Sequence, residues 1–319
     1  MGELPAMQLA PAPKALQRHF EVNDLQWLDL AYPSNEQLSY LQQRFDFHPL
    51  HLEDVHSRIQ RPKIDENEEP EYLFLVLHFP VFNEVTRLSV VSEVDIFVGQ
   101  NYLVTTHDTQ LRPLMRLLQS AEQPETRNEL MARGSGYLLY RIIETLVDSC
   151  FPMLYKLDMR LDRLEETIFE QDVQTTVQEL SFVRRDIIAL RRIIRPNIPV
   201  VRLLAAREHS FLRVDEDVYF GDLVDGLTRL WDMLEEHKEI IEGLDATLSS
   251  LTSHRINRET KLFTLISIIF LPMTLVASIL GMNVMLPYAE HPLALPLALG
   301  FMALLGAGML LYFRHKGWV

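Results

Sequence analysis

A line of small polar side chains runs along an otherwise apolar segment near the C-terminus. Its members recur at steps of three and four residues, a spacing that puts them on one face of an α-helix. They are Asn257, Thr260, Thr264, Ser267, Leu271, Thr274 and Ser278. Uncharged hydroxyl and amide groups can hydrogen-bond the water shell of a cation without holding the ion tightly. The spacing therefore predicts a pore-lining face, with Leu271 as a hydrophobic constriction in its middle.

Serine and threonine hydroxyls on a helix also have two more ordinary roles. They donate to carbonyls of their own helix, and they mediate packing between helices. The tripeptide Gly281-Met282-Asn283 favours the pathway, because it continues the polar face at the end of the segment. We expect Asn283 to meet the ion at the pore mouth.

Two uncharged apolar runs, residues 262–282 and 293–313, predict two membrane-spanning helices. At about 1.5 Å per residue, roughly 20 residues cross the hydrocarbon core. Pro272 in the first run is tolerated where neighbouring helices or water satisfy the freed carbonyl. The second run lacks a polar face and reads as an outer, lipid-facing helix. One pore-lining helix per subunit then requires several copies around an axis.

The charges that flank the two runs predict their orientation. Basic residues precede the first run and follow the second, whereas the loop at residues 284–292 has no Lys or Arg. By the positive-inside rule both termini are cytoplasmic, in the plasma (inner) membrane. The start of the chain lacks a signal-peptide pattern. Cys150 is the only cysteine, which suits a reducing compartment.

Composition narrows the partners of the remaining chain. The 319 residues carry a formal net charge of −14, and such an acidic excess argues against nucleic acid and in favour of cations. No GxxxxGK[ST] loop is present, so we predict no use of ATP. A metal hydrolase is the least favoured alternative. It would use His48, His51, Glu53, Asp54 and His56, which more simply cap a helix and pair with Arg58 and Arg61.

The N-terminal part alternates between strand and helix patterns. Residues 24–30, 71–79, 87–98 and 102–106 have strand patterns. Ser34 with Gln37 three residues later predicts a helix start, and a further helix is expected at 111–120. These elements predict an α/β domain at residues 1–134.

From about residue 135 only helical patterns remain. We expect helices at 137–169, kinked at Pro152, and at 175–194, ended or interrupted by Pro196 and Pro199. A third helix has a heptad seam of leucine and isoleucine from residue 223 to 251, with His237 filling one gap. It should run unbroken from 217 to 280, about 95 Å. We expect this seam to need oligomerisation for its burial.

These patterns divide the chain into six parts. They are the α/β domain at 1–134, a helical stalk at 135–256, a first span at 257–283, an external loop at 284–292, a second span at 293–313 and a basic cytosolic tail at 314–319.

The absence of acidic residues from the predicted pathway suggests how ions pass. Mg²⁺ loses its water reluctantly and prefers oxygen ligands, so hydroxyls and amides would bind its hydrated form. A divalent ion gains about 4–5 kcal/mol per 100 mV of inside-negative potential, which suffices for passive uptake.

Several segments together resemble the CorA family of divalent-cation channels. They are Gly281-Met282-Asn283, the two C-terminal spans, the basic tail at 313–318, and the segments at 48–55, 60–63 and 269–274. The resemblance implies a homopentameric funnel with a cytosolic α/β domain, a helical stalk and no prosthetic group. It also implies a selectivity filter of Gly281, Met282 and Asn283 for hydrated Mg²⁺, and gating by intracellular Mg²⁺ bound between subunits. Co²⁺ or Ni²⁺ would pass as well.

The chain departs from this family in two places. The external loop carries Glu290 and His291 where the family often has a different acidic stretch, and these two residues either attract cations at the outer mouth or are solvated bystanders. The regulatory acidic position of the stalk helix aligns near Ala246, with Asp245 adjacent, and its partner falls near Asn83 and Glu84. The chain therefore departs from the usual pair, and Asp245 and Glu84 are the candidate regulatory residues.

Two other membrane functions remain open. One is a Zn²⁺ transporter like the related ZntB branch, with proton coupling; the pore face lacks the nitrogen and sulfur ligands that zinc prefers. The other is a non-conducting membrane scaffold or sensor.

Overall fold

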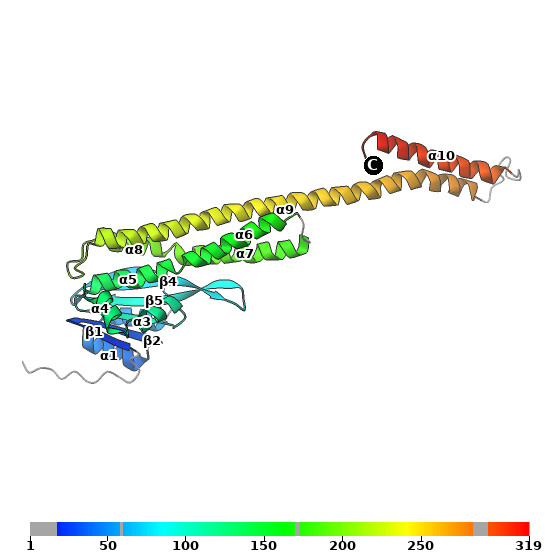
Figure 1. Ribbon diagram of the computed structural model, residues 1–319. Coiled ribbons are helices and arrows are strands. Elements are labelled where there is room, and N and C mark those ends of the chain that lie inside the picture. Colours follow the sequence, from blue (N-terminus) through cyan, green and yellow to red (C-terminus); the bar gives the residue numbers. More distant parts are fainter. Residues whose placement is uncertain (1–17, 58–59, 170–172, 283–292, 319) are drawn as a thin grey trace, which may run out of the picture. The chain divides into compact units, whose positions relative to one another are not determined.

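The computed structural model describes residues 18–57, 60–169, 173–282 and 293–318. The chain forms two compact units, Met1–Leu244 and Asp245–Val319. The first unit contains a β-sheet and most of the helices, as Figure 1 shows. The second contains the end of one long helix and a C-terminal apolar helix. The predicted fold class, an α/β domain with a long helix and two apolar C-terminal segments, is confirmed.

The sheet of the first unit has six strands in the order β1-β2-β6-β5-β4-β3. Only β2 and β6 pair in parallel; the other neighbours are antiparallel. The strands are β1 (Arg18–Val22), β2 (Leu25–Ala31), β3 (Lys63–Glu68), β4 (Glu71–Asn83), β5 (Leu88–Val98) and β6 (Tyr102–His107). The sequence pattern predicted the four inner strands. It missed β1 and β3, because these edge strands are short and partly exposed and therefore lack an apolar run.

One face of the sheet packs against two short helices, α1 (Asn35–Phe45) and α2 (Pro49–Ser57). The predicted capping box starts α1: the Ser34 amide donates to Gln37 Oε1 at 2.7 Å, and the Gln37 amide donates to Ser34 Oγ at 3.3 Å. The core between these layers is apolar and closely packed. It includes Leu28, Leu30, Leu41, Phe47, Val55, Phe74, Val76, Phe97 and Val104.

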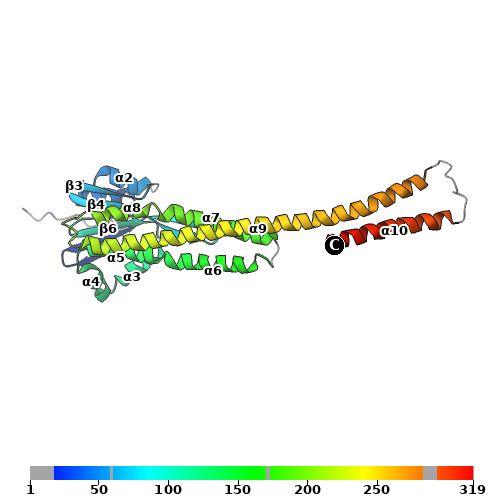
Figure 2. The ribbon, with the colours of Figure 1, turned by 90° about the horizontal axis from the view of Figure 1, so that it is seen from above.

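The opposite face is covered by helices from the part of the chain predicted to be the stalk. Helix α7 (Val173–Ile194) packs on β4 and β5, α8 (Asn197–Ala206) on β3 and β4, and α5 (Ser135–Asp148) on β5 and β6. Figures 1 and 2 show these helices beside the sheet. Two shorter helices, α3 (Arg112–Ser120) and α4 (Pro124–Met131), pack against α5. The sheet is therefore buried on both faces.

The single kinked helix expected at 137–169 is in fact two helices. Helix α5 ends at Asp148, and α6 (Phe151–Thr167) begins three residues later with Pro152 in its first turn. Proline fits a first turn because that position needs no amide donor, so it starts a helix here instead of bending one. Pro196 likewise separates α7 from α8, as predicted.

The predicted long helix is present as α9 (Glu216–Leu280), with Pro272 inside it. Within the first unit, the residues that form its seam are buried, and they follow one another at steps of three and four. They are Phe220, Leu223, Leu227, Leu230, Leu234, His237, Ile241 and Leu244. The expectation that burial of this seam requires oligomerisation was wrong, because helices of the same chain cover it. His237 Nε2 lies 2.5 Å from Asp158 Oδ1 of α6, and Arg191 of α7 pairs with Glu235 at 2.6 Å.

In the second unit, the end of α9 lies beside α10 (Ala294–His315), as both ribbon views show. These two helices are long and apolar enough to cross a membrane. A Cβ built on Gly306 of α10 would lie 3.3 Å from Met273 Sδ of α9, so the absent side chain at position 306 lets the helices approach closely. Helix α10 extends into the predicted tail and includes Arg314 and His315.

Candidate functional site

The polar face predicted for the first span lies on a continuous helix. Helix α9 ends at Leu280, and the Gly281 amide still donates to Ala277 O at 2.9 Å. Met282 then leaves the helix. The third residue of the tripeptide, Asn283, and the loop residues Glu290 and His291 lie outside the described residues.

All seven members of the polar face are exposed in the single chain, including Leu271, which is 70% exposed. The side of α9 that packs against α10 is different. It is centred on Leu265, which is 4% exposed, and on Met273. At 100° per residue, the packed side and the polar side lie about 170° apart around the helix. Helix α10 therefore leaves the polar face uncovered.

Three hydroxyls on this face have the same geometry. Thr264 Oγ1 donates to Thr260 O, Ser267 Oγ to Phe263 O and Thr274 Oγ1 to Phe270 O, each at 2.8 Å. This back-bonding is one of the ordinary roles of such hydroxyls. It uses the proton of each hydroxyl and leaves the oxygen lone pairs as acceptors. Water in the shell of a cation points its hydrogens outward, so an acceptor-only surface suits a hydrated cation.

The expected regulatory residues come from separate parts of the chain. Glu84 is exposed in the hairpin between β4 and β5, and Asp245 lies partly exposed on α9 at the start of the second unit. Among the residues that the structure describes, no three His, Cys, Asp or Glu side chains are grouped so that they could hold a metal ion. One chain alone thus does not form a complete regulatory site in its described part.

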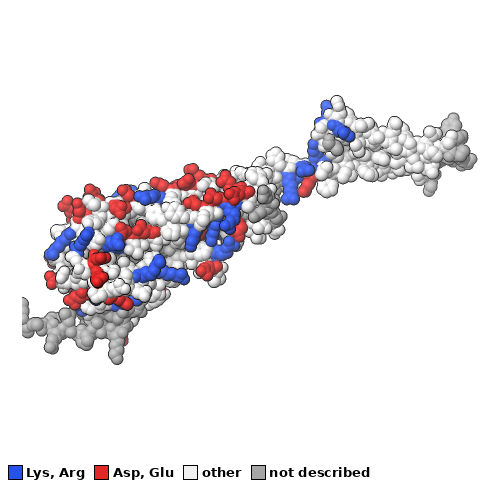
Figure 3. All heavy atoms as spheres, viewed as in Figure 1, with Lys and Arg blue, Asp and Glu red and all other residues white. Residues whose placement is uncertain are grey.

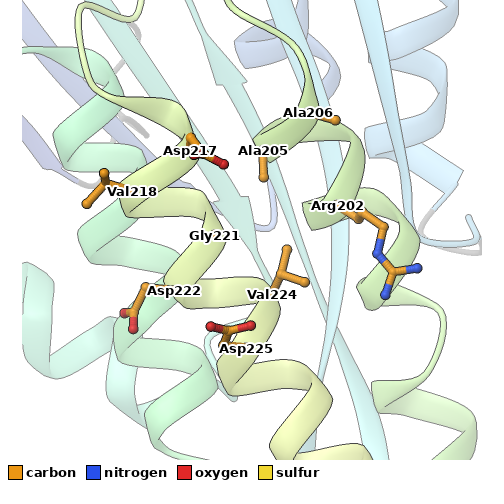
Figure 4. A pocket seen from close by; sticks show the side chains of 9 residues that line it. All are labelled: Arg202, Ala205, Ala206, Asp217, Val218, Gly221, Asp222, Val224 and Asp225. Carbon is orange, nitrogen blue, oxygen red and sulfur yellow. The ribbon is translucent and has the colours of Figure 1, made fainter.

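The first turns of α9 carry a different acidic cluster, which sequence reasoning did not single out. A shallow pocket there, drawn in Figure 4, is lined by Asp217, Asp222 and Asp225 together with Arg202 of α8. The Arg202 guanidinium points away from the three carboxylates. Tyr140 of α5 donates to Asp222 Oδ2 at 3.3 Å. Acidic residues near a helix N-terminus are also favoured by the helix dipole, so the cluster has a structural explanation.

The histidine-rich segment on α2 supports the sheet and forms no metal centre in the described chain. His51 Nδ1 lies 2.9 Å from the Tyr72 hydroxyl, which also accepts a bond from the His48 amide. Burial lowers the pKa of His51. Asp54 accepts a bond from Lys63 at 2.7 Å, and its expected partner Arg58 lies outside the described residues. These contacts join α2 to β3 and β4.

The basic tail returns to α9, a contact that the sequence pattern did not reveal. Lys261 Nζ donates to Gly317 O at 3.5 Å and lies 5.6 Å from the centre of the Trp318 ring. Trp318 packs on Phe313, and Gly317 has a φ of +70°, which glycine adopts without strain. In the sequence, the only local indication of this turn is a glycine that follows a basic last helical turn.

Comparison with known proteins agrees with this arrangement. The profile of the family described as "CorA-like Mg2+ transporter protein" matches residues 22–315. The chain belongs to this CorA-like family. As a member, it is a divalent metal ion transporter.

Individual CorA relatives match nearly the whole chain. The YfjQ protein of Bacillus subtilis is 32% identical over 293 residues, covering 92% of this chain and 89% of that protein. The cobalt/magnesium transport protein CorA of Thermotoga maritima is 30% identical, covering 86% of this chain and 78% of that protein. The complete structure of the CorA magnesium transporter of Methanocaldococcus jannaschii matches the fold with a TM-score of 0.81 at 23% identity, covering 96% of this chain and 95% of that one.

Proposed function

We propose that this CorA-like protein is a channel for passive uptake of hydrated Mg²⁺, with Co²⁺ and Ni²⁺ as further substrates. Several copies, five by family resemblance, place the polar face of α9 around a common axis. Asn283 with Gly281 and Met282 forms the filter at the outer end, and Glu290 and His291 flank the outer mouth. Both termini then lie in the cytoplasm, and membrane potential drives the ion without ATP.

The observation that supports this function most is the uncovered polar face of α9. Seven positions at helical spacing are exposed, while α10 packs on nearly the opposite side of the helix. Hydroxyl groups directed at lipid tails gain nothing, whereas a water-filled pathway solvates them. Because the polar face of α9 has no carboxylate, it exchanges a divalent ion quickly.

Closure at high internal Mg²⁺ is the regulatory part of the proposal. Glu84 and Asp245 belong to different parts of the chain, and each offers one carboxylate. A site shared between neighbouring subunits would bring such single carboxylates together, and Mg²⁺ held there would keep the subunits in the closed arrangement.

Ion flux through the purified full-length chain in liposomes tests the proposal. We expect uptake of Mg²⁺ and Co²⁺ that rises with an inside-negative potential and falls as internal Mg²⁺ is raised. Asn283→Ala should abolish selective Mg²⁺ uptake. Asn101→Ala, at an exposed asparagine before β6, is the matched control.

Three results would contradict the proposal. Unchanged selectivity in Asn283→Ala removes the filter. Flux of Zn²⁺ that Mg²⁺ does not compete with, particularly with proton movement, indicates a zinc transporter. The absence of any flux, with polar positions of α9 that accept bulky apolar residues, indicates a scaffold.

A further inference from the structure

We propose that the cytoplasmic ends of α9 and α10 form a binding site for the headgroup of an anionic phospholipid. This inference concerns the lipid that surrounds the transporter and goes beyond the ion pathway. It rests on the charge of the second unit, on the contact that joins α9 to the tail, and on the position of that contact beside the apolar spans.

The two units differ in the sign of their charge. Residues 245–319 hold five Lys and Arg against three Asp and Glu, a net of +2, whereas residues 1–244 hold 25 against 41, a net of −16. The five cations of the second unit flank the two apolar runs. They are Arg255, Arg258, Lys261, Arg314 and Lys316. The blue side chains of this unit in Figure 3 lie at the start of its apolar part and at the end of α10.

The tail contact brings cations from both helices together. Lys261 is the last charged residue before the first apolar run, and it reaches Gly317 and Trp318 beyond α10. This contact fixes the register of the antiparallel helices, so Arg314 and Lys316 lie within about two helical turns of the level of Lys261. All three belong to the same membrane–water interface.

These cations have N–H donors beyond those that they use in contacts within the chain. The bond to Gly317 O uses one of the three N–H donors of Lys261. Within the described part of the second unit, only Arg255 has a carboxylate partner, Glu259 at 3.8 Å. A phosphodiester at the membrane surface offers acceptor oxygens of the complementary charge. Trp318, on the same contact, is an aromatic residue of the type that settles at headgroup depth.

Tryptophan quenching by brominated lipids can test this site in the full-length protein. Trp27 and Trp231 belong to the first unit, so Trp318 is the tryptophan of the second. The protein is reconstituted in vesicles of phosphatidylcholine and phosphatidylglycerol with one lipid brominated at a time. Each cation near an anionic surface favours the anionic lipid roughly fivefold, so we expect phosphatidylglycerol to be enriched at least that much around Trp318. Trp318→Phe should remove the signal.

The variant R314Q/K316Q should lower the enrichment at least about fivefold, because it removes two of the three cations at this contact and leaves Lys261. The control R116Q/K238Q removes the same charge from an exposed and a partly exposed position of the first unit and should keep the enrichment. R314K/K316R should also keep the enrichment, which separates loss of charge from loss of folding.

An equal preference for both lipids in the native chain, or an unchanged preference in R314Q/K316Q, would overturn the proposal. Loss of the preference when excess inorganic phosphate is added would assign the cations to a free anion instead. The quenching experiment does not require ion flux, so its result tests the lipid site independently of the transport proposal.

Discussion

The side chain of Asn197 makes the two hydrogen bonds that a neighbouring strand would make with His78. Asn197 Nδ2 donates to His78 O at 2.6 Å, and Asn197 Oδ1 accepts from the His78 amide at 3.0 Å. His78 has no pairing partner in β3, because β3 pairs with β4 only from Glu71 to Val76. The first residue of α8 thus satisfies a sheet edge that is otherwise left without a partner.

Replacing Asn197 should therefore destabilise the first unit. Asn197→Ala leaves the partly buried amide and carbonyl of His78 unsatisfied, which costs about 2 kcal/mol of unfolding free energy. Asn197→Asp should also destabilise, because a carboxylate cannot donate to His78 O. Thermal unfolding of the purified protein measures both, with Asn101→Ala as control. Equal melting temperatures for Asn197→Ala and Asn101→Ala would show that the two bonds are unimportant.

Contact between α9 and α10 should depend on Gly306 far more than on Gly308. A Cβ at Gly306 meets Met273 at 3.3 Å, whereas one at Gly308 has no neighbour within 4 Å in the described chain. Gly306→Leu should separate the helices and lower the melting temperature of the detergent-solubilised protein by several degrees, since overpacking costs about 1–3 kcal/mol. Gly308→Leu should have little effect. A similar loss in Gly308→Leu would place that glycine against another copy of the chain.

The hydroxyls of the polar face should matter for ion flux and not for folding. Thr274→Val keeps the shape of the side chain but removes the oxygen, so we expect Mg²⁺ flux to fall at least about fivefold, the equivalent of one hydrogen bond. Thr228→Val is the matched control, because Thr228 in the first-unit part of α9 back-bonds to Val224 O in the same way. Normal flux in Thr274→Val would remove this hydroxyl from the pathway.

The single thiol of the chain should be inert. Cys150 is 1% exposed, and burial raises its pKa to about 12. At pH 8 about one thiol in 10⁴ is then ionised, and only the thiolate attacks disulfide reagents. We expect no release of thionitrobenzoate from Ellman's reagent by the native protein, and one equivalent after unfolding. C150A/S253C, with a cysteine at an exposed position, should react in the native state. Rapid reaction of native Cys150 would disprove its burial.

Acid should weaken the attachment of α2 through His51. Burial lowers the pKa of His51 in the folded chain below its ordinary 6.5, so the unfolded chain takes up the proton first. The contribution to stability is complete above about pH 6.5 and is lost as the pH falls below it. His51→Gln should make the melting temperature less dependent on pH between 7.5 and 5.5. His56→Gln, on the exposed side of α2, should keep the original dependence.

Local patterns in the sequence determined the type of most elements and the membrane segments. The Ser34 capping box, the inner strands and the unbroken helix to Leu280 depend on neighbouring residues or on a regular period, and each is present. The polar face of α9 is likewise a property of spacing along one helix. These features needed no knowledge of the distant parts of the chain.

Only the tertiary structure decided which parts of the chain cover one another. The edge strands β1 and β3 have weak patterns and exist because β2 and β4 offer them hydrogen bonds. The seam of α9 is closed by α6 and α7 of the same chain, and Asn197 lies 119 positions from His78. Such contacts depend on how separate segments meet in space. The period of the α9 seam predicted a buried face, but it could not show which helices cover that face, since these partners lie far away along the chain.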